Sequence, residues 1–284
     1  MRDPPLGSAS PEQSYWPLDD EEIVCGNQKN LRKRGDNNAA TVRTRDRQMS
    51  QLAKPLAPAP TNLVGPTELP KGDSLFEQFD WLYILCREKL FRNDTRRMVK
   101  VFWPNTRPPS NSRLVELGCG PGFYSRTLAR SFPELEVLGV DKSCRQVEYA
   151  EQKAIALGVN NCRFERGDVL DVTRPAQSFD YLIASRLFTV LPGPERALAE
   201  MFRVLKSGGR CFIAEPRYKF WASIPLFMLW LVASVSGQAN GCREPSKATV
   251  FSRERFERLF HTQPWKSVRV WREGRYHYAL CEKR

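Results

Sequence analysis

The sequence has little histidine, no closely spaced cysteines and no apolar run long enough to cross a membrane. Its two histidines, His261 and His277, and eight cysteines without a Cys-x-x-Cys pair form no zinc-binding pattern. Scattered cysteines are typical of a reducing compartment, because a core of this size needs no disulfide framework. The first residues also lack the apolar run of a secretory signal. We expect no metal and a cytoplasmic location, with peripheral membrane contact and organelle targeting left open.

Positive charge is present in excess, and it is concentrated near the C-terminus. The 284 residues contain 44 Lys and Arg against 32 Asp and Glu, which gives a net charge of +12. The segment 1–70 is balanced, whereas 217–284 carries most of the surplus. A basic surface favours anionic partners such as nucleic acid or lipid headgroups. A contact with an anionic partner is therefore expected in the last quarter of the chain.

The chain divides at about residue 70. The segment 1–70 is rich in Pro, Ser, Asn and charge and ends in a proline-rich linker, so we expect a disordered leader there. One domain is expected over 71–284. It begins with a helix over 73–92, because Ser74 and Glu77 have the spacing of a capping box and apolar residues follow at helical intervals.

Strand-like and helical patterns then alternate, which predicts βαβ units on a parallel sheet. The expected strands are 113–118, 135–141, 162–166, 179–185 and 209–215, followed by a hairpin of 265–272 and 275–282 around Glu273-Gly274. The expected helices are 122–131, 143–157 ending at Gly158, 194–206 ending at Gly208-Gly209, and one near 252–260. A proline-rich connection is expected between the first helix and the first strand.

The most informative segment joins the first strand to a helix through Gly118-Cys119-Gly120-Pro121-Gly122. Glycine is needed where a ligand presses against the backbone, and a new helix presents free N–H groups there. A dinucleotide fingerprint would require glycine at position 123, where Phe123 stands. The segment therefore favours a nucleoside-type ligand over a pyrophosphate.

Acidic residues follow the second and third strands. Asp141 ends the second strand, where its carboxylate can accept hydrogen bonds from ribose hydroxyls. Asp168 follows the third strand, where it can receive an exocyclic amine while Val169 packs against a purine. Because aspartate also caps turns after strands, a purely structural role of Asp168 stays open.

These motifs, together with Leu-Lys-Ser-Gly-Gly-Arg at 205–210, closely resemble class I S-adenosylmethionine-dependent methyltransferases over about 113–215. The resemblance implies an α/β, Rossmann-like fold with a seven-stranded sheet of order 3-2-1-4-5-7-6 and helices on both faces. An Ala-Glu-Pro end of the fifth strand, an apolar segment and a Phe-Ser-Arg-Glu-Arg-Phe helix resemble the ubiquinone/menaquinone C-methyltransferase-like branch, the methyltransferase type 11 group.

The resemblance also implies the cofactor, S-adenosyl-L-methionine, and its site. Glu116 would support the loop, the three glycines would line the methionine portion, Asp141 would bind ribose, and Asp168 with Val169 would bind adenine. The implied cofactor site comprises Glu116, Gly118, Cys119, Gly120, Gly122, Asp141, Lys142, Asp168, Val169 and Ser185.

The catalytic group is not fixed by the sequence. The segment after the fourth strand lacks the Asn/Asp-Pro-Pro-Tyr/Phe motif of many base and glutamine methyltransferases, and Arg186 and Phe188 stand where many small-molecule enzymes carry a histidine-containing segment. A base is optional, because positioning supplies much of the rate of methyl transfer. The candidates are Arg186 for an anionic or phenolate oxygen, Glu215 for a hydroxyl, and Tyr124, which with Trp81 and Phe76 could wall the acceptor pocket.

An apolar insertion over 217–250 separates the fifth strand from the last helix. No charged residue occurs between Lys219 and Arg243, but the apolar run within this stretch, 220–236, is interrupted by Pro225 and falls short of the roughly 20 residues of a membrane span. We expect a lid over the pocket, a face that enters a bilayer interface, or both. A hydrophobic small-molecule acceptor follows: a quinone, isoprenoid, sterol-like molecule or polyketide.

Two alternatives stay open. One is a noncatalytic, membrane-associated protein that binds S-adenosylmethionine. The other is an RNA methyltransferase, which the basic segments suggest but which charge alone supports poorly, since ion pairs on solvated faces account for most of it. We expect no DNA partner.

Overall fold

The structure is a computed structural model that describes residues 80–235 and 249–284. The predictions for the leader 1–70, for residues 73–79 of the first helix and for the distal part of the insertion lie outside these residues. Phe76, a predicted wall of the acceptor pocket, also lies outside the described residues.

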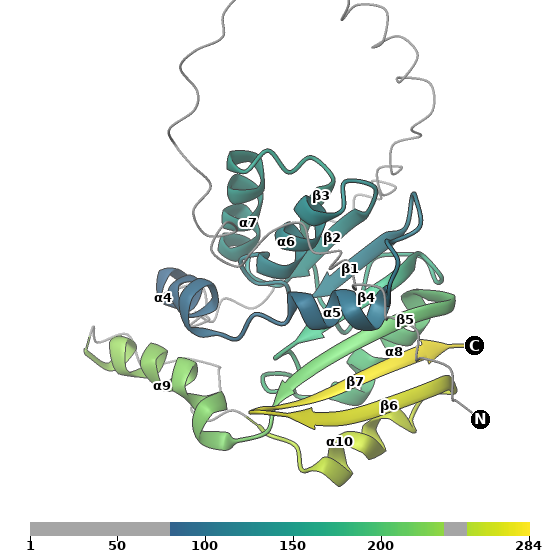
Figure 1. Cartoon of the computed structure of the whole chain (residues 1–284). Coiled ribbons are helices and arrows are strands. Elements are labelled where there is room, and N and C mark those ends of the chain that lie inside the picture. The colour runs from purple at the N-terminus through teal and green to yellow at the C-terminus, as the bar shows by residue number, and fades with distance from the viewer. Residues whose placement is uncertain (1–79, 236–248) are drawn as a thin grey trace, which may run out of the picture. The chain divides into compact units, whose positions relative to one another are not determined.

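A seven-stranded sheet of order β3-β2-β1-β4-β5-β7-β6 forms the centre of the domain (Figure 1). The predicted α/β fold and strand order are confirmed. The strands are β1 (Arg113–Leu117), β2 (Glu136–Asp141), β3 (Cys162–Arg166), β4 (Phe179–Ser185), β5 (Leu205–Pro216), β6 (Trp265–Glu273) and β7 (Tyr276–Lys283). The first five strands pair in parallel, and β7 pairs antiparallel with both β5 and β6. The predicted hairpin at Glu273-Gly274 is therefore present.

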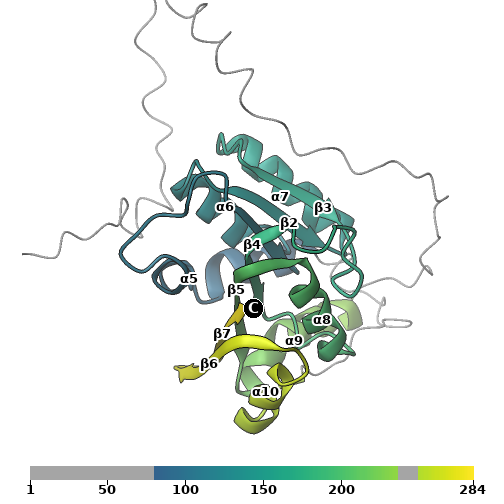
Figure 2. The same cartoon turned by 90° about the vertical axis from the view of Figure 1, so that its right-hand side faces the viewer.

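Helices pack on both faces of the sheet (Figure 2). They are α4 (Asp80–Leu85), a π-helical turn η1 (Cys86–Leu90), α5 (Thr95–Phe102), α6 (Phe123–Ser131), α7 (Cys144–Ala156), α8 (Pro194–Val204), α9 (Lys219–Val235) and α10 (Arg253–Phe260). Buried side chains of α5, α6 and α7 fill one core, and those of α8 and α10 fill the other. This division follows from the strands, whose successive side chains point to opposite faces.

Helix α7 agrees with its prediction, including its termini. The Ser143 side chain accepts a hydrogen bond from the Gln146 N–H, which caps the first turn. Gly158 follows the last turn with a φ of +66°, a left-handed conformation that glycine adopts without strain. The N-terminal cap and the glycine after the C-terminus each depend on a few neighbouring residues, and the structure contains both.

The predicted boundary between the helix 194–206 and the strand 209–215 is wrong. Helix α8 ends at Val204, and β5 begins at once at Leu205. Phe179 pairs with Leu205 and Tyr181 with Arg210, so the extra residues of β5 form a bulge between these two pairs. Gly208, with a φ of +75°, serves that bulge and not a helix end.

The region before β1 also differs from its prediction. The expected helix 73–92 appears, within the described residues, as α4 followed by a π-helical turn that ends at Leu90. The expected proline-rich connection contains the additional helix α5, which buries Met98 and Phe102 against the sheet. The prolines at 104, 108 and 109 follow α5 and do not interrupt it, so the segment before them can form a helix.

The proximal part of the insertion forms α9, which lies beside α4. Several of its apolar side chains are exposed, among them Phe220, Phe227, Leu231 and Val235. Within 80–235 and 249–284, no helix combines the length and the hydropathy that a membrane crossing requires.

Candidate active site

The glycine loop lies where β1 passes into α6, at the carboxyl edge of the parallel strands. Gly118, Gly120 and Gly122 have φ values of +71°, +51° and +73°. Gly122 is the N-cap of α6 and provides no side-chain cap. Glu116 accepts a hydrogen bond from the Ser125 N–H, so the N–H groups of Phe123 and Tyr124 are the ones left to a ligand in the first turn. The sequence predicted this turn from glycine spacing alone.

The glycines have different neighbours. A Cβ at Gly120 would lie 3.1 Å from the Tyr83 ring of α4, and one at Gly118 would lie 2.8 Å from Leu187. A Cβ at Gly122 would lie only 2.4 Å from the Phe164 ring. Gly122 is thus required for packing against β3, whereas Gly120 faces α4. The contact with Tyr83 was not foreseen, because it joins the loop to a helix outside the recognised motifs.

Asp141 braces the glycine loop from the end of β2. Its Oδ2 accepts a hydrogen bond of 2.7 Å from the Gly120 N–H, and its Oδ1 accepts one of 3.0 Å from the Ser143 N–H. Burial raises the pKa of Asp141, and these N–H groups oppose the rise. A carboxylate has about four acceptor positions, so this side chain can still accept hydrogen bonds from a ribose. The neighbouring Lys142 is exposed.

Glu116 links β1 to the first turn of α6. Its Oε2 accepts hydrogen bonds from the Ser125 N–H, at 2.8 Å, and from the Ser125 Oγ, at 2.6 Å. The side chain is buried, and desolvation raises its pKa to about 7. The structure therefore places Glu116 in the supporting position that the resemblance implied.

The remaining predicted cofactor residues differ in how far their side chains are buried. Asp168 is exposed and its Oδ1 accepts a hydrogen bond from the Leu170 N–H, the turn-forming role that the sequence left open. Val169 and Cys119 are buried, and burial raises the pKa of the Cys119 thiol well above its ordinary value. Ser185 is half-buried at the end of β4.

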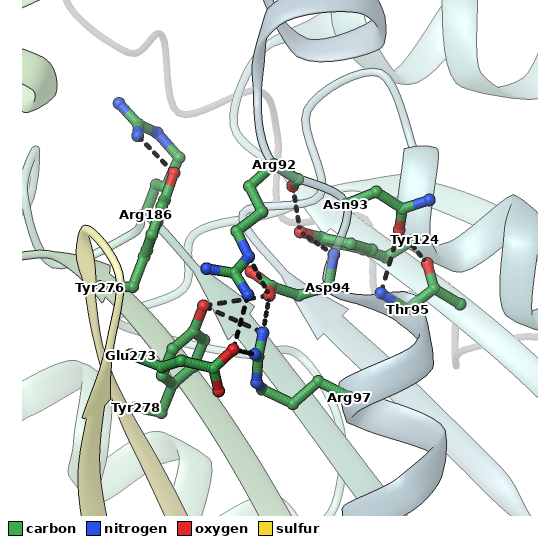
Figure 3. Close-up of polar contacts among 10 residues, drawn as sticks. All are labelled: Arg92, Asn93, Asp94, Thr95, Arg97, Tyr124, Arg186, Glu273, Tyr276 and Tyr278. Atoms are coloured by element: carbon green, nitrogen blue, oxygen red, sulfur yellow. Dashed lines mark hydrogen bonds and ion pairs between the residues drawn. The ribbon is translucent and has the colours of Figure 1, made fainter. Parts of the chain in front are cut away.

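Arg186 follows β4 with a φ of +59°, which is uncommon for a residue other than glycine. Its Nη1 donates a hydrogen bond of 3.0 Å to the Tyr276 hydroxyl (Figure 3). Its guanidinium carbon lies 4.2 Å from the centre of the Phe91 ring. Phe91 in turn makes an edge contact with Tyr83, the residue beside Gly120. Arg186 therefore connects the end of β4 to the glycine loop through aromatic side chains.

Glu215 is fully buried at the end of β5. Its Oε1 accepts a hydrogen bond of 2.8 Å from the Phe188 N–H, and its Oε2 has no hydrogen-bond partner among the described residues. Desolvation raises its pKa to about 8, although the positive charge of Arg186 opposes this. One carboxyl oxygen of Glu215 thus holds the loop after β4, and contact of this side chain with an acceptor hydroxyl stays a prediction.

Tyr124, a candidate wall of the acceptor pocket, is hydrogen-bonded to the segment before α5. It is buried, and its hydroxyl donates a hydrogen bond to the Arg92 carbonyl and accepts one from the Asp94 N–H (Figure 3). Asp94 also accepts a hydrogen bond from Tyr278 and forms ion pairs with Arg92 and Arg97. This network fastens the segment before α5 to the hairpin. Trp81, the other predicted wall, is exposed on α4.

Two residues at this edge were missed in the sequence. Tyr276 and His277 start β7, which runs antiparallel to β5, so His277 pairs with Glu215 and Tyr276 with Pro216. His277 is buried, stacks on Phe256 and has a pKa lowered by burial. The implied strand order could have located them. If the last strand lies antiparallel beside the fifth, its first residues must lie at the carboxyl edge of the parallel strands.

Comparison with known proteins agrees with this geometry. Residues 109–261 match the family described as "Methyltransferase domain". The rice protein "2-methyl-6-phytyl-1,4-hydroquinone methyltransferase 1, chloroplastic" is 31% identical over 121 residues, 42% of this chain and 36% of its own length. A "Trans-aconitate 2-methyltransferase" from Deinococcus radiodurans is 35% identical over 105 residues, 37% of this chain and 38% of its own length. The matched segment covers well under half of either relative.

A solved structure shows the same fold. The crystal structure of a putative S-adenosyl-L-methionine-dependent methyltransferase from Methanococcus maripaludis aligns with a TM-score of 0.53 at 17% identity. The alignment covers 77% of this chain and 97% of that chain.

Proposed function

We propose that this chain, which belongs to the methyltransferase domain family, is an S-adenosylmethionine-dependent methyltransferase. Its acceptor is a hydrophobic molecule with a phenolic hydroxyl, such as an alkylated hydroquinone. The observation that carries the proposal is Arg186, whose guanidinium is held between an aromatic ring and the Tyr276 hydroxyl at the end of β4. In sheets of this type the carboxyl ends of the strands bind the ligands.

The residues present fit the cofactor. The left-handed glycines leave the loop backbone bare, and Asp141 retains acceptor positions at the end of β2. The Gln146 side chain is buried with neither amide atom hydrogen-bonded within the described residues, and its Oε1 lies 3.9 Å from the position of a Cβ on Gly120. A polar ligand at the loop would satisfy this amide.

The bound cofactor supplies a methyl carbon, which bonds to the acceptor as the carbon–sulfur bond breaks, its electron pair stays on sulfur, and the acceptor releases one proton. Arg186 would stabilise the phenolate oxygen of the acceptor by charge-assisted hydrogen bonds. Tyr276 orients the guanidinium, and Phe91 covers its face. This arrangement needs no dedicated base if the phenolate forms in water before binding.

An exposed apolar surface supports a hydrophobic acceptor. It consists of Trp81, Leu85, Phe220, Phe227, Met228, Leu231 and Val235, contributed by the neighbouring helices α4 and α9. Arg217 and Lys219 lie at the start of α9, where they suit anionic headgroups. We propose that this apolar surface rests on a bilayer interface, from which an acceptor with an alkyl chain reaches the carboxyl edge of the sheet.

The test is methyl transfer from labelled S-adenosylmethionine to two acceptor classes, alkylated hydroquinones and trans-aconitate. We expect labelled hydroquinone only. Arg186→Gln should lower kcat/KM for the hydroquinone about 100-fold, or about 3 kcal/mol, because it removes the charge at the phenolate. The exposed arginine of α10 provides the control Arg258→Gln, which should behave as wild type. Transfer to trans-aconitate, or full hydroquinone turnover by Arg186→Gln, would overturn the proposal.

A further inference from the structure

Arg87 is a buried cation whose terminal nitrogens have no hydrogen-bond partner in the described part of the chain. Its side chain, in the π-helical turn η1, is 7% exposed, and neither Nη1 nor Nη2 is hydrogen-bonded within the described residues. Burying a charge in this way is expensive unless another charge or a set of hydrogen bonds compensates it. Local π-helical turns also occur frequently at functional sites.

The position of Arg87 relates it directly to the glycine loop. Its guanidinium carbon lies 4.3 Å from the centre of the Phe123 ring and 4.2 Å from that of Tyr124. These are the first two residues of α6, immediately after Gly122. Tyr83, four residues before Arg87 in the same helical segment, faces Gly120. Tyr83 and Arg87 therefore cover the loop and the N-terminus of α6.

The acidic groups around Arg87 do not neutralise it by direct pairing. Glu116 is close enough to interact with its charge, but the Glu116 carboxyl group is hydrogen-bonded to Ser125. Glu88, the next residue in the turn, forms its ion pair with Arg126. The first turn of α6 adds the N–H groups of Phe123 and Tyr124, which lie beside the Ser125 N–H that Glu116 occupies. A bound anion would thus be stabilised from two directions.

We propose that Arg87 binds the carboxylate of the methionine portion of S-adenosylmethionine. This rests on the cofactor assignment and extends it to a residue outside the matched segment 109–261. The planar guanidinium fits a carboxylate with two parallel hydrogen bonds, and the two rings fix the plane. The N–H groups of Phe123 and Tyr124, in the first turn of α6, would donate to the same anion. The turn that carries Arg87 would then hold the methionine portion, while Asp141 would hold the ribose.

The experiment compares a ligand that has the carboxylate with one that lacks it. Dissociation constants of S-adenosylmethionine and of 5′-methylthioadenosine are measured by calorimetry for wild type, Arg87→Met and Arg87→Lys. We expect Arg87→Met to weaken S-adenosylmethionine binding about 30- to 100-fold and to leave methylthioadenosine within about twofold. Arg87→Lys, which keeps the charge but loses the planar fork, should fall between. Arg96→Met, at an exposed arginine of α5, is the control and should match wild type.

The other outcomes overturn the proposal in distinguishable ways. Equal losses for the two ligands would make Arg87 a packing residue, and unchanged affinity for S-adenosylmethionine would remove it from the site. Wild-type protein that binds neither ligand would refute the cofactor assignment and this proposal with it, whereas a failed hydroquinone assay would leave the binding result standing. If Arg87→Met does not fold, Arg87→Gln serves as the neutral variant in the same comparison.

Discussion

The two sides of the site are built differently. On the cofactor side, around β1, β2 and α6, the loop is fixed by backbone N–H groups: Gly118 and Cys119 donate to the Val140 carbonyl, and Gly120 donates to Asp141. On the acceptor side, around β5, β7 and α9, one carboxyl oxygen of Glu215 has no hydrogen-bond partner within the described residues, and apolar side chains of α9 are exposed. The proposed cofactor side is therefore held by main-chain hydrogen bonds, whereas the proposed acceptor side depends on side chains.

Gly122→Ala should destabilise the cofactor side more than any other change proposed here. A left-handed conformation costs an alanine about 1–2 kcal/mol, and the new Cβ would lie within 3 Å of Phe164 and Ala150, which adds roughly 1–3 kcal/mol of overpacking. We expect thermal or urea unfolding to show a loss of about 3–4 kcal/mol.

Gly158→Ala is the matched control for that prediction. Gly158 has a φ of +66°, but a Cβ there would have no neighbour within 4 Å. The loss should therefore stay near 1–2 kcal/mol, the cost of the backbone alone. Equal losses in the two variants would show that the contact with Phe164 does not constrain the loop.

The same contrast explains what the sequence could predict. Strand order, the glycine turn, Asp141 and the Glu116 support are carried by short segments whose residue types and spacing are tied to one local geometry. Gly208 was assigned to a helix end because the same pair Gly208-Gly209 suits a helix cap or a bulge, and only the pairing of β4 with β5 decides between them.

The residues that were missed depend on contacts across long stretches of chain. Tyr276 reaches Arg186 from 90 positions away, and His277 meets Glu215 only because β7 inserts beside β5. Tyr83 and Arg87 act through a helical segment that carries no motif of its own. Periodicity indicates which face of such a helix is buried, but it does not indicate which loop that face covers.

The acceptor side can be sharpened through the pH dependence of stability. Because burial raises the pKa of Glu215 from its ordinary value of 4.5 to about 8, its contribution to stability is full below the unfolded pKa. It is lost as the pH rises from there through about 8, and it changes no further above that pH. Glu215→Gln keeps an acceptor for the Phe188 N–H and cannot ionise. We expect this variant to be more stable than wild type at pH 9 by on the order of 2 kcal/mol, and the difference to shrink at pH 6.

Glu200→Gln is the control for the Glu215 comparison. Hydrogen bonds from Arg203 lower the pKa of Glu200, so its titration lies below its ordinary range and cannot change the slope between pH 6 and pH 9. Urea unfolding at the two pH values measures both variants. A wild-type slope in Glu215→Gln would show that the carboxyl group is ionised throughout this range.

The smallest effect concerns the exposed apolar surface of α4 and α9. The double variant Phe227→Ser, Leu231→Ser removes two exposed apolar side chains, so the free energy of unfolding should change by less than about 0.5 kcal/mol. Binding to anionic lipid vesicles should weaken about tenfold, or about 1.4 kcal/mol, because less apolar area enters the interface. The control is Ile155→Ser, which removes a still more exposed apolar side chain from α7 and should leave vesicle binding unchanged. If both variants lose vesicle binding alike, general surface hydrophobicity and not α9 determines the contact with lipid. If neither variant loses vesicle binding, the basic residues alone hold the protein to the lipid.

Methyl transfer to a water-soluble hydroquinone should be the same in wild type and in both variants, since the variants leave Arg186 and the glycine loop intact.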